Sequence, residues 1–412
     1  MKPTTIHNIP GGITAPRGFL AAGLHAGIKK PSILDLALVA SEQPGPVAGL
    51  FTRNQVAAAP VVLDRLHLKQ GQGHGQGMGR AFIVNSGNAN ACTGAQGLAD
   101  AKETATLTAQ CLGVPVRSIF VGSTGVIGQF LPMPVIRQGV PRLVQRLRRT
   151  GGREAAKAIM TTDLKPKDVA LRARIAGHMV TVGGMAKGSG MIHPNMATML
   201  AYLTTDAAIA QPVLQRALRA AVETSFNCIS VDGDTSTNDT VLCLANGLAG
   251  NALFRDGTKE LAAFQALLSE ACRSLAMRIC RDGEGVTKIV HVLVTGAKSA
   301  ADAKAVANTV GTSCLVKTAF FGGDANWGRI MAAVGRAGVR IRPERIGLTI
   351  EGAPIVKGGV SLGRAAERAI EKLFRRREFR IVIDLGLGSA QGALWTTDLS
   401  YEYVRINASY RS

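Results

Sequence analysis

The sequence predicts a layered α+β fold, and three observations support this fold class. Strand-like and helix-like patterns alternate along the chain, with no long linker between them. The predicted helices are segregated from strands of mixed direction, which is typical of layered α+β proteins. The chain has 412 residues, of which 46% are hydrophobic, and a mean hydropathy of +0.16. It is therefore long and apolar enough for two or three domains, or for two closely fused halves.

Strands and helices are predicted in turn along both halves of the chain. In the first half, we predict strands at 80–90 and 118–128, helices at 99–113, 132–147 and 152–160, and a hairpin over 168–184. In the second half, we predict strands at 199–209, 287–297, 380–387 and 390–399, two strands around a polar turn within 228–247, and helices at 212–226, 258–280, 300–311, 326–335 and 364–379. Apolar residues at helical spacing, with proline in a first turn or glycine after a last turn, mark the helices.

The positive charge of the chain raises the question of a nucleic-acid partner. The formal net charge is +20 and the pI is near 10.2. Aromatic residues, which stack on bases, make up only 4% of the chain. The basic residues are dispersed, and no helix-turn-helix, zinc-finger or RNP motif is present. We therefore expect no nucleic-acid partner, whereas a basic surface can attract small anionic substrates.

Three absences narrow the class of protein further. No run of 18 apolar residues could span a membrane, and the polar start MKPTTIHNIPGG lacks the apolar stretch of a signal peptide. The seven cysteines have no C-x-x-C or zinc-ligand spacing, so we expect buried free thiols in the reducing cytoplasm. Asp232, Asp234 and Asp239 are not spaced as in an EF-hand loop, and we expect no metal site.

The segment AKGSGMIHPNMATML, residues 186–200, places two glycines and a proline before Thr198. One interpretation is a turn followed by a threonine that begins a strand. The other is that a strained turn presents the Ala197–Thr198 bond for attack by the Thr198 hydroxyl. Cleavage would leave an α-amine on Thr198, with an ordinary pKa of about 7.7–8.0, that can take the hydroxyl proton. His193 has no evident Asp or Ser partner, so we interpret it as structural, and the residues alone leave the two interpretations of Thr198 open.

The string KGSGMIHPNMATML is long and specific, and other stretches accompany it in a fixed order. They are FTRNQVAAAPV, VNSGNANACTG, GSTGVIG, MTTD, NCISVDGDTSTND, RDGEGVTK, FGGDANWGRI and YVRINASYRS. Together they resemble the ornithine acetyltransferase family, the bifunctional glutamate N-acetyltransferases of arginine biosynthesis. The resemblance spans about residues 6–412. We interpret NSGNAN, FGGDANWG and SVDGDTSTND as architecture near the site rather than as catalytic groups.

The resemblance implies a layered αββα sandwich with a smaller second α/β domain, roughly residues 285–400. It also implies that the chain cuts itself between Ala197 and Thr198. Residues 1–197 would then form an α chain and residues 198–412 a β chain that begins with the nucleophile. The two chains would stay packed together, and two of each would form a heterotetramer.

The resemblance also assigns site residues. Thr198 is the nucleophile, and Thr124 and Gly125 form the oxyanion hole, where a hydroxyl and a backbone N–H stabilise a developing negative charge. The remaining residues implied to bind substrate are Thr161, Lys187, Glu284, Asn407 and Ser412. Thr162 is an alternative to Thr161, and the sequence ends in Ser412 where the family more often has threonine.

The reaction implied is acetyl transfer from N2-acetyl-L-ornithine to L-glutamate through an acetyl-threonine. No cofactor is implied, although acetyl-CoA could serve as a second acetyl donor. Two alternatives are a self-processing amidase or aminopeptidase with the same threonine, and a basic binding protein without catalysis. Release of acetate without glutamate would favour the first alternative, and salt-dependent oligonucleotide binding without processing would favour the second.

Overall fold

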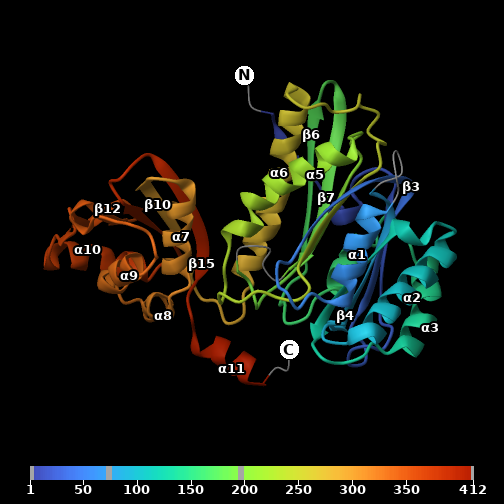
Figure 1. The fold of residues 1–412 in the computed structure, drawn as a ribbon, viewed down its shortest axis with the longest axis horizontal. Helices are drawn as coiled ribbons and strands as arrows, with labels where there is room; N and C mark the ends of the chain where they lie inside the picture. The colour runs from blue at the N-terminus through green and yellow to red at the C-terminus, as the bar shows by residue number, and fades with distance from the viewer. Residues whose placement is uncertain (1–3, 71–76, 194–198, 410–412) are drawn as a thin grey trace.

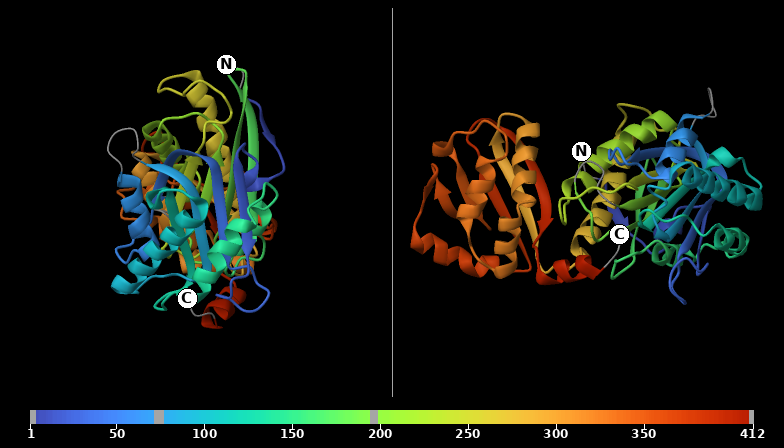
Figure 2. Two further views of the ribbon diagram at one scale, coloured as in Figure 1. Left: turned by 90° about the vertical axis from the view of Figure 1, so that its right-hand side faces the viewer. Right: turned by 60° about the horizontal axis from the view of Figure 1, so that its bottom comes forward.

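The protein consists of a larger body, which contains most of the chain, and a smaller C-terminal domain beside it (Figures 1 and 2). The computed structural model describes residues 4–70, 77–193 and 199–409. Both parts combine helices with sheets of mixed strand direction, so the predicted α+β class is confirmed.

One long strand, β3 (Leu36–Phe51), joins two β-layers in the larger body. Its first part, Leu36–Ala40, pairs with β2 and β4 in one layer, and its last part, Val47–Phe51, pairs with β9 in the other. The pairing register with β4 shifts between Ala40 and Gly45, where the chain crosses from layer to layer. A Cβ on Gly45 would lie 1.7 Å from the Ala245 carbonyl oxygen, so only glycine fits this crossing.

The two layers share β3 but otherwise contain different strands. The first layer contains β2 (Phe19–Leu24), β4 (Met78–Asn88) and β5 (Ile119–Val126). The second contains β1 (Ile6–Asn8), β6 (Lys167–Ile175), β7 (His178–Lys187), β8 (Leu200–Thr205) and β9 (Thr240–Ala245). The pairs β4–β5 and β8–β9 are parallel. The carboxyl ends of β4 and β5 therefore lie at one edge, where polar side chains can gather.

Helices cover the outer face of each layer. On the first layer lie α1 (Ala59–Lys69), α2 (Gly94–Leu112) and α3 (Met133–Gln145). On the second lie α5 (Gln211–Glu223) and α6 (Lys259–Arg281), while α4 (Gly152–Ala158) packs against the core between the layers. Short 3₁₀ helices occupy Gly12–Thr14, Val116–Ser118, Phe226–Cys228 and Pro343–Arg345. Among the helices that the described residues form, none has the length and apolarity needed to cross a membrane.

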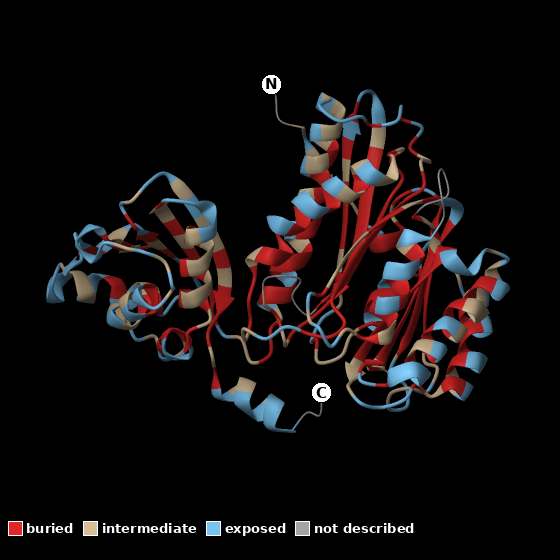
Figure 3. Cartoon of the chain, viewed as in Figure 1, coloured by how far each residue is buried: buried red, intermediate tan, exposed pale blue. Residues whose placement is uncertain are grey.

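The strands of both layers are largely buried (red in Figure 3), and side chains of both layers belong to one apolar cluster between them. Phe82 of β4 and Tyr202 of β8 meet across the sandwich, with ring centroids 5.3 Å apart. Beneath the Tyr202 hydroxyl lies Gly122, where a Cβ would come within 1.9 Å of the Tyr202 oxygen. With helices outside both layers, this arrangement confirms the αββα sandwich that the resemblance implies.

The C-terminal domain has its own six-stranded sheet and its own apolar core. Its strands are β10 (Ile289–Ala297), β11 (Gly347–Ile350), β12 (Ala353–Lys357), β13 (Val360–Ser361), β14 (Glu378–Asp384) and β15 (Ala390–Thr397). Its helices are α7 (Ala300–Gly311), α8 (Cys314–Gly322), α9 (Trp327–Gly335) and α10 (Arg364–Phe374). The fold class is therefore confirmed in its second part too, since the smaller domain is α/β.

The two parts meet along the end of β15. The Ser230 amide donates to the Trp395 carbonyl oxygen (2.8 Å), and Ile229 and Trp395 form an isolated parallel bridge. Beyond this seam, the last helix, α11 (Tyr401–Ser409), leaves the smaller domain and returns towards the larger body (Figures 1 and 2). The C-terminal helix therefore contributes to a site that the larger body holds.

Two predicted elements differ from the structure, and one long strand was not predicted. The segment 228–247 forms one strand, β9, because Asp232 and its neighbours form a loop held by side-chain bonds to the backbone. The predicted helix 364–379 ends at Phe374, because Phe374 and Phe379 pack together (ring centroids 5.0 Å apart) and β14 already begins at Glu378. The strand β3 was missed because Pro44 and Pro46 normally interrupt strands, and here they lie at its crossing.

The expectation that the cysteines are buried holds for only part of the set. Cys243, Cys272 and Cys280 are buried. Cys92, Cys111 and Cys314 are exposed because they lie in a loop or at helix ends, and Cys228 is half-buried.

Candidate active site

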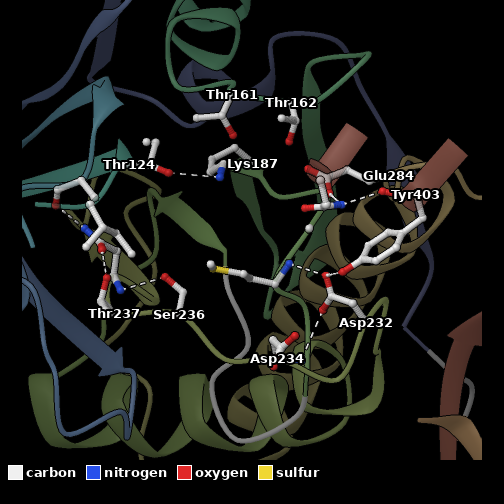
Figure 4. Close-up of a pocket in the computed structure, with 17 residues that line it drawn as sticks. Thr124, Thr161, Thr162, Lys187, Asp232, Asp234, Ser236, Thr237, Glu284 and Tyr403 are labelled. Carbon is white, nitrogen blue, oxygen red and sulfur yellow. Dashed lines mark hydrogen bonds between the residues drawn. The ribbon is translucent and has the colours of Figure 1, made fainter. Parts of the chain in front are cut away.

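A pocket lies where the ends of β5 and β7, the loop before β9 and the helix α11 meet (Figure 4). It brings together six of the residues singled out from the sequence: Thr124, Gly125, Thr161, Lys187, Glu284 and Asn407. Ala197, Thr198 and Ser412 lie outside the described residues. Chain segments more than 280 residues apart in sequence therefore build one polar cavity.

The hydroxyl of Thr124 and the ammonium of Lys187 face each other inside the pocket (Figure 4). Lys187 Nζ donates a hydrogen bond to Thr124 Oγ1 (3.1 Å), and both residues are buried. Burial lowers the pKa of Lys187, while the nearby Asp163 carboxylate acts in the opposite direction. Since Thr124 Oγ1 accepts from the lysine, the Thr124 proton remains available to a group in the cavity.

Gly125 follows Thr124 in a backbone conformation that favours glycine, with φ +134°. A Cβ there would lie 2.3 Å from the Gly87 carbonyl carbon, so no other residue fits beside β4. Asparagines hold the surrounding backbone: Asn238 donates to the carbonyl oxygens of Ala89 (2.6 Å) and Ser123 (2.8 Å). The NSGNAN and TND stretches thus fix the end of β5, in agreement with their predicted architectural role.

A buried ion cluster connects three segments that carry pocket residues. Lys167 Nζ bonds Asp163 Oδ1 (2.5 Å) and Asp282 Oδ2 (2.6 Å). Asp163 also accepts from the backbone N–H groups of Gly188 (2.8 Å) and Thr161 (3.0 Å). Burial opposes the charge of Asp163, but Lys167, Lys187 and the Gly188 N–H together hold its pKa at about 2. The cluster therefore positions the backbone beside Lys187, Thr161 and Glu284. Sequence reasoning missed it because Asp282 lies 115 residues after Lys167 in the chain.

The carboxylate of Glu284 lies at the other end of the pocket from Thr124. Glu284 Oε2 accepts from Asn407 Nδ2 of α11 (2.8 Å), and the Glu284 amide donates to the Ser189 carbonyl oxygen (3.0 Å). A Cβ on Gly190 would lie 2.5 Å from this carboxylate, so glycine there lets the 187–190 turn approach it. The pocket thus offers a cation and a carboxylate to a small substrate.

Both alternative threonines line the cavity. The Thr162 hydroxyl shares a hydrogen bond with the Ser189 hydroxyl (2.6 Å). The Thr161 hydroxyl has no hydrogen-bond partner in the described part of the chain, and it lies beside Lys187 in Figure 4. Of the two, Thr161 is the hydroxyl that is free to bind a ligand.

Two further residues, Asp232 and Tyr403, line the pocket, although the sequence gave Asp232 only as part of a stretch near the site and did not single out Tyr403. Asp232 accepts from the backbone N–H groups of Met191 (2.6 Å) and Ile192 (2.9 Å) and from the Tyr403 hydroxyl (3.3 Å). Burial raises the pKa of Asp232 to about 6, although the N–H donors oppose this. Tyr403 opens the C-terminal stretch quoted above. The resemblance implied that Asn407 and Ser412 of this stretch bind substrate, but it assigned no role to Tyr403.

The expectation that His193 has no Asp or Ser partner was wrong. Its Nδ1 lies 3.3 Å from the Ser230 hydroxyl oxygen. That hydroxyl also donates to the Ile192 carbonyl oxygen (3.1 Å), so the contact joins two loops. In the part of the chain that the structure describes, no group of three or more His, Cys, Asp or Glu side chains is placed to hold a metal ion.

A free hydroxyl, a glycine turn, a buried lysine and a carboxylate around one cavity define an enzyme that acts on small charged molecules. The chain belongs to the ArgJ family, whose sequence profile matches residues 20–412. It is 50% identical to the arginine biosynthesis bifunctional protein ArgJ of Geobacter sulfurreducens, over 96% of this chain and 99% of that protein. It is 48% identical to the protein of the same name from Symbiobacterium thermophilum, over 98% of this chain and 99% of that protein. The crystal structure of ArgJ from Bacillus halodurans matches with 44% identity and a TM-score of 0.49, over 51% of this chain and 98% of that chain.

Proposed function

We propose that this protein is a glutamate N-acetyltransferase that moves an acetyl group from N2-acetyl-L-ornithine to L-glutamate through an ester on Thr198. The observation that carries the proposal is the meeting of Thr124, Lys187 and Glu284 in one pocket. Met199, which follows Thr198 in the sequence, donates its backbone N–H to Asp239 Oδ1 (3.1 Å), and Asp239 follows the pocket residue Asn238.

Maturation and catalysis use the same hydroxyl. In the first reaction, Thr198 Oγ attacks the Ala197 carbonyl carbon, the amide nitrogen leaves, and water hydrolyses the resulting ester. The products are an Ala197 carboxylate and a Thr198 α-amine. That amine can take the hydroxyl proton in every later turnover, so the site needs no separate base.

Acetyl transfer then proceeds in two steps. Thr198 Oγ attacks the acetyl carbonyl, its proton passes to the α-amine, and the C–N bond breaks as the departing ornithine nitrogen takes that proton. The glutamate amine next attacks the acetyl ester, Thr198 Oγ leaves and regains a proton, and N-acetylglutamate is released. In both steps the negative oxygen is stabilised by the Thr124 hydroxyl and the Gly125 N–H.

The charged groups of the pocket suit both substrates. We assign Lys187 and the free Thr161 hydroxyl to a substrate carboxylate, since both lie on one side of the cavity. Glu284, oriented by Asn407, is placed to pair with the ornithine ammonium. These groups recognise an amino-acid acceptor, which an amidase that passes the acetyl group to water would not need.

Further parts of the proposal concern assembly and donors. We propose that the α chain (1–197) and the β chain (198–412) remain associated as a heterotetramer of two copies each, in the cytoplasm. Each chain contributes strands to the sandwich, because β8 and β9 of the β chain lie between β7 and β3 of the α chain.

We also propose that acetyl-CoA could serve as a second acetyl donor. An assay with glutamate as acceptor, in which acetyl-CoA replaces acetylornithine as the donor, tests this.

Intact mass of the purified protein beside a Thr198→Ala variant tests the proposal. We expect the wild type to appear as fragments of residues 1–197 and 198–412 and the variant to stay whole. Transfer of isotopically labelled acetyl from acetylornithine to glutamate should follow cleavage. A wild-type chain that stays whole and inactive would refute the proposal, and acetate release without glutamate would favour the amidase.

A further inference from the structure

Lys29 is a half-buried lysine that lies behind the wall of the pocket and does not line it. Its ammonium donates a hydrogen bond to the Met160 carbonyl oxygen, immediately before Thr161 in the chain. Its aliphatic stem lies beside Gly87, where a Cβ would come within 2.9 Å of Lys29 Cγ. Gly87 of β4 pairs with Gly125 of β5. One side chain therefore connects the end of these strands with the backbone that carries Thr161.

The turn that carries Lys29 is fixed by a buried carboxylate. Asp35 is 0% exposed. It accepts hydrogen bonds from four consecutive backbone N–H groups, those of Ala26 (2.6 Å), Gly27 (3.1 Å), Ile28 (2.7 Å) and Lys29 (3.0 Å). Hydrogen bonds to a charged acceptor are stronger than those between neutral groups. The Lys29 side chain therefore starts from a fixed point and ends at another, the Met160 carbonyl.

Charged groups from three parts of the fold surround the Lys29 ammonium. Asp35 precedes β3, Asp163 follows α4, and Lys187 ends β7. Burial lowers the pKa of Lys29 to about 8 and the Lys187 charge adds to this effect, while the two carboxylates oppose it. Asp163 is itself paired with Lys167 (2.5 Å), which balances its charge.

The position of Asp35 gives the Lys29 side chain a direction. Asp35 accepts from the Lys29 backbone N–H, so the negative charge lies at the start of the side chain and the ammonium at its end. His25 lies at the negative end too, with its Nδ1 3.5 Å from Asp35 Oδ2. The positive end is held next to the backbone of Thr161, on the side of the pocket where Lys187 lies.

We propose that Lys29 is a positioning residue of the substrate-carboxylate subsite, where it holds the Met160 carbonyl and supplies a second positive charge behind Lys187 and Thr161. This inference rests on the proposed function, which assigns the substrate carboxylate to those two residues. Acetylornithine and glutamate both carry an α-carboxylate, so the Lys29 charge should strengthen the binding of each. An amine without a carboxylate gains nothing from that charge.

The first test is the Lys29→Met variant, which keeps the aliphatic stem but removes the charge and the N–H donor. Calorimetry measures its binding of ornithine and of putrescine, which is ornithine without the carboxylate. We expect ornithine to bind the variant about fivefold to tenfold more weakly than the wild type, and putrescine to bind both proteins alike. Equal losses for the two ligands would show a general distortion of the pocket and would overturn the proposal.

The second test uses Lys29→Arg, because arginine stays charged at high pH. Wild-type Lys29, with a pKa of about 8, loses its proton between about pH 7 and about pH 9.5. The kcat/KM for acetylornithine of Lys29→Arg, divided by that of the wild type, should therefore rise about fivefold over this range. The ratio cancels groups that both proteins share, such as Lys187. The ratio of the wild type to Lys29→Met should fall over the same range, and two flat ratios would overturn the proposal.

Lys30→Met is the matched control, since Lys30 is the next residue and is exposed. This variant should bind ornithine as the wild type does. The same loss in Lys30→Met and Lys29→Met would show an effect of overall surface charge and would overturn the proposal. If Lys29→Met does not fold, the pH dependence of Lys29→Arg decides alone.

Failure of this inference is distinguishable from failure of the proposed function. A wild type that binds ornithine and transfers acetyl, beside Lys29 variants with the same ornithine affinity and pH profile, would overturn the inference alone. A wild type that neither binds ornithine nor transfers acetyl would overturn both.

Discussion

At the scale of single residues, the hydrogen bond from Lys187 to Thr124 decides what the threonine can do. A hydroxyl can donate one proton, and here its oxygen accepts from an ammonium at 3.1 Å. The threonine proton is thereby directed to the cavity, where a negative oxygen would develop. The lysine contributes its charge to the same region, which lowers the cost of forming that oxygen.

The first prediction concerns this hydroxyl. Thr124→Val keeps the size of the side chain but removes the donor, so kcat for acetyl transfer should fall by about 100-fold to 1,000-fold. Thr124→Ser keeps the donor and should stay within about tenfold of the wild type. Rates are measured on the cleaved fraction, quantified by intact mass. Equal rates for the valine and serine variants would remove Thr124 from the oxyanion hole.

At the scale of elements, α11 serves the site and contributes little to the core. The helix has no buried residue, yet Tyr403 bonds Asp232 and Asn407 bonds Glu284. An element of this kind should affect binding much more than folding, because stability follows buried apolar surface.

The second prediction is a truncation after Ser400, which removes α11 and the predicted contact Ser412. Thermal melting should change little, whereas kcat/KM for acetylornithine should fall by about tenfold or more, as expected for lost hydrogen bonds to charged groups. Glu402→Gln is the control, since Glu402 forms a surface ion pair with Arg405 (2.7 Å) on the same helix. A truncated enzyme with wild-type kcat/KM would show that α11 has no role in binding.

A second element-scale feature is Lys317 of α8, which is buried against the end of β15. It donates to the Thr397 carbonyl oxygen and to the hydroxyls of Thr397 (3.0 Å) and Thr396 (3.4 Å). Burial lowers its pKa to about 8 from 10.5, although nearby acidic groups oppose this. Between these values the unfolded chain binds the proton more tightly than the folded protein, so this lysine makes stability rise with pH.

The third prediction follows from this rise of stability with pH. The free energy of unfolding of the wild type relative to Lys317→Met should increase from pH 8 to pH 10.5, by up to about 3 kcal/mol. Denaturant unfolding at a series of pH values measures it. Replacing the exposed Lys298 by methionine should produce no such trend. A constant difference across this range would mean that Lys317 is charged and well solvated in the folded protein.

At the scale of the whole molecule, the spacing of the two β-layers rests on close fits between their inner faces. Gly122 of one layer faces the Tyr202 hydroxyl of the other, and that hydroxyl is buried without a hydrogen-bond partner among the described residues. The sandwich thus tolerates an unsatisfied polar atom at its centre, where a methyl group on Gly122 would not fit.

The fourth prediction is a double-mutant cycle across the sandwich. Gly122→Ala should destabilise the protein by about 1–3 kcal/mol, since its Cβ would lie 1.9 Å from the Tyr202 oxygen. Tyr202→Phe should be neutral or stabilise it by about 1 kcal/mol, because it removes an unpaired buried hydroxyl. The double variant should recover most of the loss, as read from melting temperatures. Strictly additive effects would show that the two residues do not meet.

The site was predictable where its residues stand in specific local strings. Thr124 and Gly125 lie in one glycine-rich string, GSTGVIG, and Lys187 lies in the long string before Thr198, so the resemblance could mark them. The ion cluster around Asp163 was missed because its partner Lys167 also binds Asp282, which lies 115 residues further along the chain. Tyr403 was missed because its partner, Asp232, is 171 residues away.

The sequence by itself determined the alternation of strands and helices, the family, and the short strings that carry most of the pocket residues. These properties depend on near neighbours in the chain, through apolar periodicity, turn residues and local motifs. The tertiary structure alone decided that β3 passes between layers and that Lys167 meets Asp282, 115 residues away, in a buried ion cluster. Such features depend on which segments, far apart in the sequence, pack against each other and are buried from water. Burial and charge pairing between distant residues leave no periodic signal in the chain.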